Sequence, residues 1–412
     1  MEKMRIVVGG FIGLFPTGGA TWDYLQYPLG LKLLGHDVYY IEDTQLYPVY
    51  QASGDSWDDC TFGVEYLKKA MAEIGMEDRW AYRDVATGKT FGLSDSKLKE
   101  VCETADVYIN VSSSTVWRDE YRKIPVKILI DTDPMFTQYQ YHLKMEAGGT
   151  EAEYSRDYMH GHDLFFTFGL NIGKPDCRIP QFEYNWLTTK KPICTDFWDQ
   201  PFTNQSKFGF TSIMNWTERP DFIYEGETWG QKNKEFRKFF DLPTVSKQKF
   251  EIIINRPKDA ATAQSINNLM DRGWDILSPN HLISDKENYK NFVQSSFAEF
   301  SVTKETYIKS NSGWFSGRSA VYLASGRPVL TQDTQWSKYI PAGEGVLAIS
   351  DLDTAAQAVE EVTGNYEKHS RAAREIAREY FDSGKILSDI LAHVDSKKEL
   401  ALDSSQARQV PV

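Results

Sequence analysis

The chain has 412 residues, of which 41% are hydrophobic and 25% are charged. This composition is that of an ordinary globular protein, and it excludes wholesale disorder, collagen and a coiled-coil rod. The length exceeds one usual core, so we expect two domains. The 58 acidic residues outnumber the 46 basic ones, for a net charge of −12, which gives no signal for nucleic acid as a direct partner.

An apolar stretch near the N-terminus imitates a signal peptide, because Lys3 and Arg5 precede the apolar residues 6–15. Glu2 and the interrupting glycines favour a strand and a loop instead. No apolar run approaches the roughly 20 residues of a membrane span. The four cysteines show no CxxC or zinc-ligand spacing. We therefore expect a cytoplasmic protein with no transmembrane segment and no bound metal.

The first half of the chain alternates between short apolar strands and helices. Residues Arg5–Val8 and Val38–Ile41 read as strands on either side of a helix over Tyr24–Leu34, which Gly35 ends. Further strands are predicted at 107–111, 128–130 and 164–168, with helices over 64–74 and 97–103. This alternation predicts a parallel sheet that helices cover on both faces.

A stretch rich in Pro and Trp, from about Cys177 to Lys207, separates this pattern from a second one. We place an N-terminal domain over residues 1–204 and a C-terminal domain over 205–381. The second pattern predicts strands at 250–254, 275–277, 299–302, 329–330 and 346–349, with helices near 260–271, 286–295, 318–325 and 353–363. Two helices follow, near 365–380 and 384–394, and the polar residues 396–412 are expected to form a flexible tail.

The strongest functional signal is segment 311–335, a loop rich in Gly and Ser that runs into a short helix near Gly317. The free N–H groups and the dipole of a helix start favour an anion, and Arg318 adds a guanidinium fork. A buried strand around Val329 follows, and ligands of open α/β sheets bind at the carboxyl ends of strands. The segment predicts a site for a diphosphate, with a tight helix-to-strand connection as the alternative.

Segment 310–335, followed by Pro341-Ala-Gly-Glu-Gly-Val-Leu-Ala-Ile349, resembles the donor half of a GT-B nucleotide-sugar glycosyltransferase. The resemblance extends to Thr17-Gly18-Gly19, which precedes a helix ending in Gly-Leu-Lys-Leu-Leu-Gly-His-Asp-Val. It implies an α/β GT-B fold, in which two doubly wound, Rossmann-like parallel-sheet domains face an interdomain cleft. The first domain would bind the acceptor, the second would bind the donor, and the final helices, about 382–395, would pack back on the first.

The resemblance also implies roles for three groups of residues. The loop and the helix start would hold the donor diphosphate: Gly313, Ser316, Gly317, Arg318 and Ser319. The polar cluster after the strand would bind sugar hydroxyls: Asp333, Thr334 and Gln335. An acceptor-side loop would include Gly18, Gly19 and Trp22.

Two departures from the family bear on the mechanism. Retaining members commonly carry two Glu eight positions apart, but Gly313 and Val321 stand at the places that we align with them. Many inverting members place a His near the start of the first helix, where this chain reads Ala20-Thr-Trp-Asp23. The missing Glu pair favours an inverting mechanism.

Three carboxylates are candidate catalytic groups. Asp23, near the start of the first helix, could take a proton from an acceptor hydroxyl, with a favourable helix-dipole charge as the alternative. Asp131 and Asp133 follow the strand at 128–130, and one of them is expected to line the cleft; helix capping before Pro134 is the alternative. Their DxD pattern also resembles the metal-binding motif of the GT-A fold, but the two βαβ halves argue against that fold.

Basic residues after the strands of the second domain could neutralise a diphosphate. Arg256 and Lys304 are expected to be donor ligands, and Lys258 is expected to be a surface lysine. His160 and His162 stand too close together in the sequence to supply a full metal sphere, and no further cluster of ligands follows them.

We therefore expect a hexosyltransferase-like enzyme that moves a sugar from a nucleoside diphosphate sugar to a hydroxyl-bearing acceptor that the sequence does not identify. A UDP-sugar is the expected donor and co-substrate, and no other cofactor is expected. One alternative is a nucleotide-sugar epimerase, which would consume the donor without an acceptor. Another is a non-catalytic protein that binds a sugar or a nucleotide.

Overall fold

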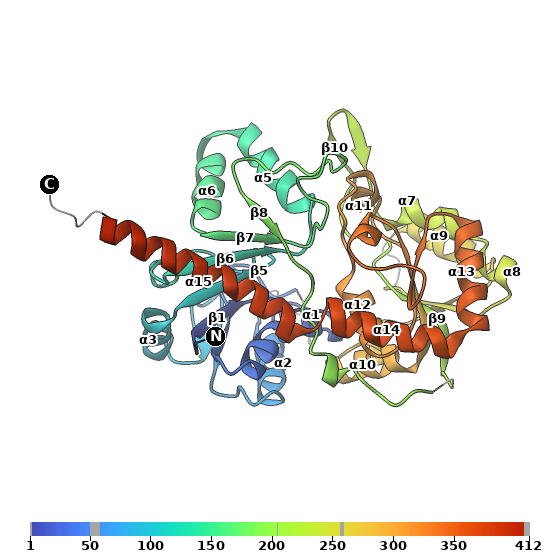
Figure 1. The fold of residues 1–412 in the computed structure, drawn as a ribbon, viewed down its shortest axis with the longest axis horizontal. Helices are drawn as coiled ribbons and strands as arrows, with labels where there is room; N and C mark the ends of the chain where they lie inside the picture. Colours follow the sequence, from blue (N-terminus) through green and yellow to red (C-terminus); the bar gives the residue numbers. More distant parts are fainter. Residues whose placement is uncertain (1, 50–57, 204, 256–258, 408–412) are drawn as a thin grey trace.

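The computed structural model describes residues 2–49, 58–203, 205–255 and 259–407, with side chains up to residue 397. Within these ranges the strands form an eight-stranded sheet, a six-stranded sheet and a two-stranded hairpin. The two larger sheets lie in two α/β halves of the molecule, side by side along its long axis (Figure 1).

The first sheet has the strand order β4-β3-β2-β1-β5-β6-β7-β8, and only the pair β3–β4 is antiparallel. Its strands are β1 (Arg5–Gly9), β2 (Asp37–Glu42), β3 (Trp80–Arg83), β4 (Thr90–Gly92), β5 (Val107–Val111), β6 (Val126–Asp131), β7 (Leu164–Thr167) and β8 (Trp186–Thr188). The helices of this half are α1 (Gly18–Leu33), α2 (Thr61–Ala72), α3 (Asp95–Thr104), α4 (Asp119–Arg122), α5 (Phe136–Ala147) and α6 (Gly149–His160). Every residue of β5 is buried, as expected for a parallel strand covered on both faces.

The second sheet is parallel throughout, with the order β13-β12-β9-β14-β15-β16. Its strands are β9 (Phe208–Ile213), β12 (Phe250–Ile253), β13 (Trp274–Leu277), β14 (Ser296–Ser301), β15 (Val329–Gln332) and β16 (Val346–Ile349). Its helices are α7 (Lys232–Phe236), α8 (Leu242–Ser246), α9 (Ala260–Met270), α10 (Lys286–Ser295), α11 (Glu305–Lys309), α12 (Gly317–Ala324), α13 (Leu352–Gly364) and α14 (Tyr366–Tyr380). The hairpin strands are β10 (Phe222–Tyr224) and β11 (Glu227–Trp229).

In each of the two larger sheets the strand that comes first in the chain lies in the middle, and the later strands are added on both sides of it. Each sheet therefore has the switch point in strand order at which doubly wound sheets bind ligands. The predicted fold class, two doubly wound parallel α/β sheets, is confirmed. The sequence pattern missed the central strand β9, because Gly209 and two hydroxyl residues weaken its apolar signal. Thr211 and Ser212 are nevertheless buried, since their hydroxyls bond to Ser296 and to the Phe300 carbonyl.

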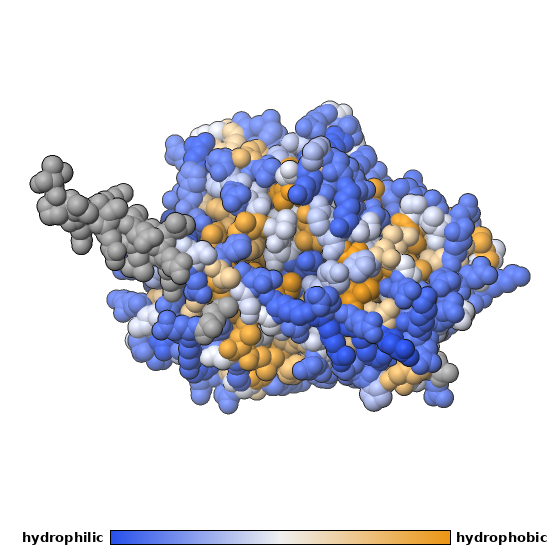
Figure 2. Space-filling view, in the orientation of Figure 1, coloured by the Kyte–Doolittle hydropathy of each residue, from blue (hydrophilic) through white to orange (hydrophobic). Residues whose placement is uncertain are grey.

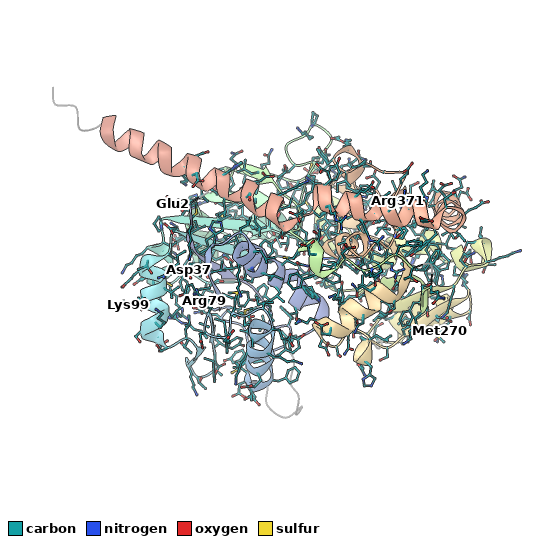
Figure 3. All side chains as sticks on the ribbon, turned by 60° about the horizontal axis from the view of Figure 1, so that its bottom comes forward. Glu2, Asp37, Arg79, Lys99, Met270 and Arg371 are labelled. Carbon is teal, nitrogen blue, oxygen red and sulfur yellow. The ribbon has the colours of Figure 1, made fainter. Side chains whose placement is uncertain are left out.

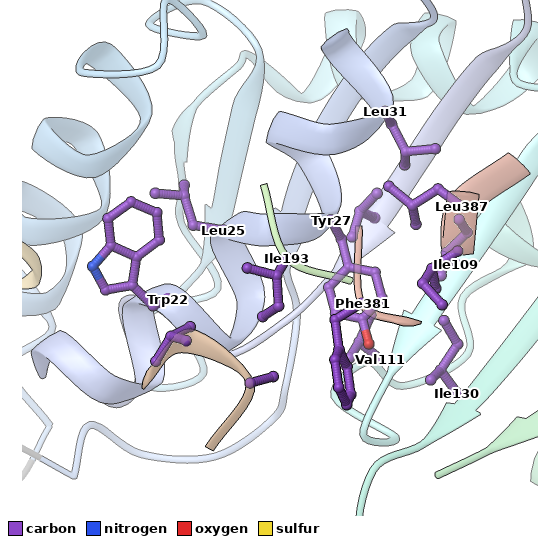
Figure 4. Close-up of a cluster of buried hydrophobic side chains, with 14 of the residues drawn as sticks. Trp22, Leu25, Tyr27, Leu31, Ile109, Val111, Ile130, Ile193, Phe381 and Leu387 are labelled. Carbon is purple, nitrogen blue, oxygen red and sulfur yellow. The ribbon is translucent and has the colours of Figure 1, made fainter. Parts of the chain in front are cut away.

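The last helix, α15 (Ser383–Ala407), crosses from the second half of the molecule to the first (Figure 1). It packs closely on α1, where a Cβ at Gly30 would lie 2.6 Å from the Leu387 side chain. Figure 4 shows Leu387 and Phe381 in one buried cluster with Tyr27 and other core residues of the first half.

Helix α15 also continues through residues 396–407, where we expected a flexible tail. Lys397 holds the helix there, because its Nζ donates to Asp163 Oδ1 at 3.0 Å. The sequence that follows is rich in Lys, Glu, Leu and Ala, which favour helix. Residues 408–412 of the expected tail lie outside the described residues.

On the face that Figure 2 shows, the surface is largely hydrophilic, with apolar side chains in scattered groups. Figure 3 shows Arg79 and Asp37 among the surface side chains, and Asp37 forms ion pairs with both Arg79 and Arg5. In the part of the chain that the structure describes, no helix is both long and apolar enough to cross a bilayer.

Candidate functional site

A pocket of about 900 Å³ lies between the two sheets. Loops that follow the carboxyl ends of β1, β5 and β6 supply one side of it, through residues such as Phe11, Ser113 and Asp133. Segments that follow β9 and β14, together with the start of α12, supply the other side. A crevice outside the carboxyl ends of parallel strands is where doubly wound folds bind their ligands.

The N-terminus of α12 forms part of the pocket wall. Ser316, Gly317 and Arg318 all line the pocket, and the extended N-cap Ser316 makes no side-chain capping bond. The first backbone bond of this helix runs from the Ala320 N–H to the Ser316 carbonyl at 3.1 Å. The N–H groups of residues 317–319 are therefore the free donors of a helix start, at the positive end of its dipole. The buried Ser319 hydroxyl also lacks a partner.

Arg318 does not offer the free guanidinium fork that we expected. Its Nε donates to Glu299 Oε1 at 2.5 Å, and its Nη1 donates to the Ile213 carbonyl at 2.5 Å. Its Nη2 donates to Ser301 Oγ at 2.9 Å. Because Glu299 is fully buried and must be neutralised, Arg318 ties the start of α12 to strands β9 and β14 instead of presenting a free charge.

Lys232 is a pocket cation that the sequence analysis missed. Burial, and then the positive charges of Arg318 and Lys304, lower the pKa of Lys232 to about 7. Among the described residues its ammonium has no hydrogen-bond or ion-pair partner. The neighbouring Gln231 is 2% exposed and lines the pocket, and its Nε2 donor is unpartnered. A ligand that brings negative charge would satisfy both groups.

Asp133 lines the pocket within a cluster of charged residues that joins the two halves. It accepts a hydrogen bond from the Tyr307 hydroxyl, and its oxygens lie 3.4 Å from Lys304 Nζ and 3.5 Å from Arg219 Nη2. Lys304 Nζ also lies 2.9 Å from Glu218 Oε2. Lys304 lines the pocket and is shared between two carboxylates, and its role as a donor ligand stays a prediction.

The Asp131 carboxylate is held in the turn between β6 and α5 and does not line the pocket. Its carboxylate accepts hydrogen bonds from Thr137 Oγ1 at 2.6 Å, Gln138 Nε2 at 3.0 Å and Thr167 Oγ1 at 2.8 Å. The Asp133 N–H is a fourth donor, at 3.1 Å. Burial raises the pKa of Asp131 and the hydrogen bonds oppose that shift. The side chain is 1% exposed, and this burial favours a structural role.

Asp23 keeps an accessible carboxylate beside the start of α12. Its side chain is 58% exposed, and Lys191 Nζ lies 3.5 Å from its Oδ1. Lys191 lines the pocket as well and also donates to the Asp23 carbonyl. Burial lowers the pKa of Lys191, and the Asp23 charge opposes that shift. A Cβ at Gly317 would lie 3.3 Å from Asp23 Oδ1, so this carboxylate adjoins the free N–H groups of α12.

Glu42 anchors the loop between β1 and α1, which carries Phe11 and Phe15 to the pocket. Its carboxylate accepts the Gly13 N–H at 2.7 Å and the Leu14 N–H at 3.0 Å. Burial raises the pKa of Glu42 to about 7, against the effect of these hydrogen bonds. Glu42, the last residue of β2, therefore fixes the position of this loop.

The residues that we expected on the acceptor side lie instead in a contact between the two halves. The Gly18 N–H donates to the Ile283 carbonyl at 3.2 Å, and a Cβ at Gly18 would collide with the Asp285 backbone. Gly19 faces the Tyr289 ring. Trp22 is 4% exposed, and its Nε1 donates to the Lys286 carbonyl at 2.9 Å. The close approach of α10 explains why glycine is needed at position 18.

The expected sugar-binding cluster forms a turn away from the pocket lining. The Gly313 N–H donates to the Thr334 carbonyl at 2.7 Å, and Thr334 Oγ1 donates to the Trp314 carbonyl at 2.7 Å. Asp333 accepts from Ser337 Oγ at 2.5 Å, and Gln335 has a left-handed backbone with φ of 78°. The Asp333 and Thr334 side chains are thus engaged in local hydrogen bonds. Arg256, the remaining expected donor ligand, lies outside the described residues.

The described ranges contain no group of three or more His, Cys, Asp or Glu side chains that could hold a metal ion.

Several solved structures share this fold. A glycosyltransferase from Rickettsia africae ESF-5 is 11% identical, with 96% of this chain and 99% of that chain covered and a TM-score of 0.54. Anabaena HepE in complex with UDP and glucose is 10% identical, with 95% and 100% covered and a TM-score of 0.53. Sucrose-phosphate synthase from Thermosynechococcus elongatus is 10% identical, with 98% and 100% covered and a TM-score of 0.52.

No family model matches the sequence, and no curated protein matches it. At such low identities the structural likeness concerns the fold. The chain has the GT-B fold of nucleotide-sugar glycosyltransferases, as the resemblance in the sequence implied.

Proposed function

We propose that the protein is a GT-B glycosyltransferase that moves a sugar from a nucleoside diphosphate sugar, with UDP as the expected nucleotide, to a hydroxyl group of an acceptor. One observation carries the proposal. The unpartnered N–H groups of α12, the Lys232 ammonium and the Gln231 amide are all hydrogen-bond donors of one pocket between the sheets.

In this proposal the diphosphate of the donor binds at the start of α12. The N–H groups of residues 317–319 and the charge of Lys232 stabilise the negative charge that develops on the leaving diphosphate. Arg318 acts indirectly, because its bond to Glu299 fixes the position of α12. The fold shared with HepE, whose structure contains UDP and glucose, supports a UDP-sugar as the donor.

Asp23 is the proposed general base, because its carboxylate is accessible from the pocket, whereas Asp131 is buried and Asp133 is paired with two cations. Asp23 takes the proton of the acceptor hydroxyl while that oxygen bonds to the anomeric carbon. The bond from this carbon to the diphosphate oxygen breaks, and the diphosphate leaves with the electron pair. A single displacement of this kind inverts the anomeric configuration.

The proposal includes a cytoplasmic location, since all four cysteines are free thiols and three of them are buried. It includes no cofactor besides the donor itself.

Titration calorimetry with UDP, GDP and ADP tests the donor site. We expect one nucleoside diphosphate to bind wild type and to bind Lys232→Met about tenfold more weakly. Lys234→Met is the matched control, because Lys234 Nζ lies 2.7 Å from Asp221 and does not line the pocket. Absence of binding by every nucleotide at millimolar concentration would overturn the proposal.

Product analysis separates the candidate reactions. A transferase consumes a UDP-sugar at a rate that depends on an added acceptor, whereas an epimerase converts the donor with no acceptor present. NMR spectroscopy of the product reports its anomeric configuration, and retention of the donor's configuration would exclude the inverting displacement.

A further inference from the structure

The pocket extends beyond the start of α12 along one face of two helices, α5 and α6. Helix α5 contributes lining residues 136, 137, 140, 141 and 144, and α6 contributes 154, 155, 158 and 159. These spacings select a single side of each helix, because positions three to four residues apart share a face. We call these nine residues the α5–α6 wall.

The turn between the two helices sets the shape of this wall. Gly148 and Gly149 both have positive φ, at 69° and 61°, a conformation that glycine adopts readily. The reversal after α5 lets α6 pack beside it (Figure 1). Both lining faces consequently belong to one continuous surface of the pocket.

Aromatic side chains give the wall its apolar area. Tyr154 is 57% exposed and stacks on Tyr158 with ring centroids 6.4 Å apart and an interplanar angle of 23°. Phe15, on the loop that Glu42 anchors, is 37% exposed and also lines the pocket. A ligand ring that packs its apolar face on these exposed aromatic rings would remove their surface from water.

The polar groups beside Tyr154 and Tyr158 are mostly neutral, whereas Phe136 of the wall lies under the Lys304 ammonium, 4.6 Å from its ring centroid. Gln140 on α5 has an exposed amide that makes no hydrogen bond among the described residues, and Ser113 is also exposed. Lys144 is the one charged side chain among the nine residues of the wall, all of which the structure describes. The polar groups of the wall thus differ from the hydrogen-bond donors at the start of α12, which favour an anion.

Ser113 belongs to a strained segment that directs hydroxyl groups to the pocket. Ser112 and Ser113 have φ of 60° and 54°, and consecutive non-glycine residues seldom adopt this left-handed conformation. Ser112 is held by a 2.6 Å hydrogen bond between its Oγ and Thr132 Oγ1. Strain of this kind persists where the surrounding structure supports it, and here it lies at the pocket.

We propose that the α5–α6 wall is the acceptor site and that the acceptor is a neutral carbohydrate. The apolar face of a sugar ring would stack on Tyr154, and its hydroxyls would bond to Gln140 and Ser113. This inference rests on the proposed glycosyltransferase function, and Asp23 and Asp133 lie in the same pocket as the wall. The sugar can be a free sugar or the end of a longer glycan, since both present the same ring.

Saturation-transfer NMR in the presence of saturating UDP tests the site without requiring turnover. The probes are methyl glycosides of glucose, galactose, mannose and N-acetylglucosamine, with maltotriose and cellotriose as the glycan arm. We expect at least one neutral probe to bind wild type and to lose about tenfold in affinity in Tyr154→Ala and in Gln140→Ala. The affinity for UDP should stay within about twofold of wild type, since neither residue adjoins α12.

Glu153→Ala is the matched control, because Glu153 precedes Tyr154 on α6, is exposed and does not line the pocket. Glucose 1-phosphate, glucuronate and p-nitrophenol are the competing ligand classes. The inference is overturned if one of them binds better than every neutral probe, if no neutral probe contacts the UDP-bound protein, or if Tyr154→Ala binds the neutral probe as wild type does. Failure of UDP itself to bind would count against the proposed function instead.

Discussion

Lys191 Nζ lies 3.5 Å from Asp23 Oδ1, and this contact joins a buried side chain to an exposed one. The Lys191 side chain is 4% exposed, whereas that of Asp23 is 58% exposed. A Cβ at Gly317 would lie 3.1 Å from Lys191 Cγ, so the lysine also packs against the start of α12. A buried cation thereby fixes the position of an accessible carboxylate next to the proposed diphosphate site.

Replacing Asp23 with Asn should remove the proposed base and leave the donor site intact. Because general-base catalysis contributes at least about 100-fold, we expect kcat for sugar transfer to fall by about that factor. The Kd for UDP should stay within about twofold, since the proposed diphosphate ligands, the N–H groups of α12 and Lys232, remain in place. The control is Asp271→Asn at the exposed C-terminal end of α9. Wild-type kcat in Asp23→Asn would exclude Asp23 as the base.

Lys191→Met should act through the position of Asp23. The substitution retains apolar packing against Gly317 and removes the charge next to the carboxylate, so we expect kcat to fall by about tenfold. The Kd for UDP should stay within about twofold of wild type, since the substitution leaves the free N–H groups of α12 and Lys232 in place. Lys190→Met is the control, since the Lys190 ammonium lies over the Tyr380 ring and outside the pocket lining. Wild-type kcat in Lys191→Met would contradict this role.

The affinity for UDP should fall as pH rises above 7. In the free protein burial lowers the pKa of Lys232 to about 7, so the ammonium loses its proton above that pH. Bound diphosphate favours the charged form, and binding must therefore take up a proton. We expect the affinity to drop by about tenfold between about pH 7 and about pH 8.5.

Calorimetry in two buffers of different ionisation enthalpy measures this proton uptake directly. Lys232→Met should bind UDP weakly and with little dependence on pH over the same range. Wild-type binding that stays constant from about pH 7 to about pH 8.5 would show that Lys232 does not hold the diphosphate.

The sequence predicted the two sheets because their strands carry strong local signals. Residues Val107–Val111 form a run that is apolar apart from Asn110, and all five are buried in β5. Strand β9 has no such run, and its hydroxyl groups are satisfied only by β14 and α12. The burial of β9 depends on hydrogen-bond partners that are distant in the sequence, so the residues of the strand alone do not predict it.

The candidate site was harder to predict. Whether a charged residue is free to bind a ligand depends on whether another side chain neutralises it, and that side chain lies elsewhere in the sequence. Arg318 and Lys304 carry the chemistry of phosphate ligands, yet Glu299 neutralises the first, and Glu218 and Asp133 pair with the second. Lys232 has no such carboxylate partner among the described residues, and its sequence surroundings contain no motif that distinguishes it from a surface lysine. Lys232 is thus free because of the tertiary structure around it, which its own stretch of sequence does not reveal.

Asp131→Ala should reduce stability without abolishing donor binding. The substitution leaves four donors, including those of Thr137, Gln138 and Thr167, without their buried acceptor. We expect the free energy of unfolding in urea to fall by about 3 kcal/mol, the usual cost of such unsatisfied groups. The matched control is Asp157→Ala on α6, whose exposed ion pair with Arg122 should contribute less than about 1 kcal/mol. If Asp131→Ala keeps wild-type stability and loses sugar transfer, Asp131 takes part in the reaction and our structural assignment of this residue is wrong.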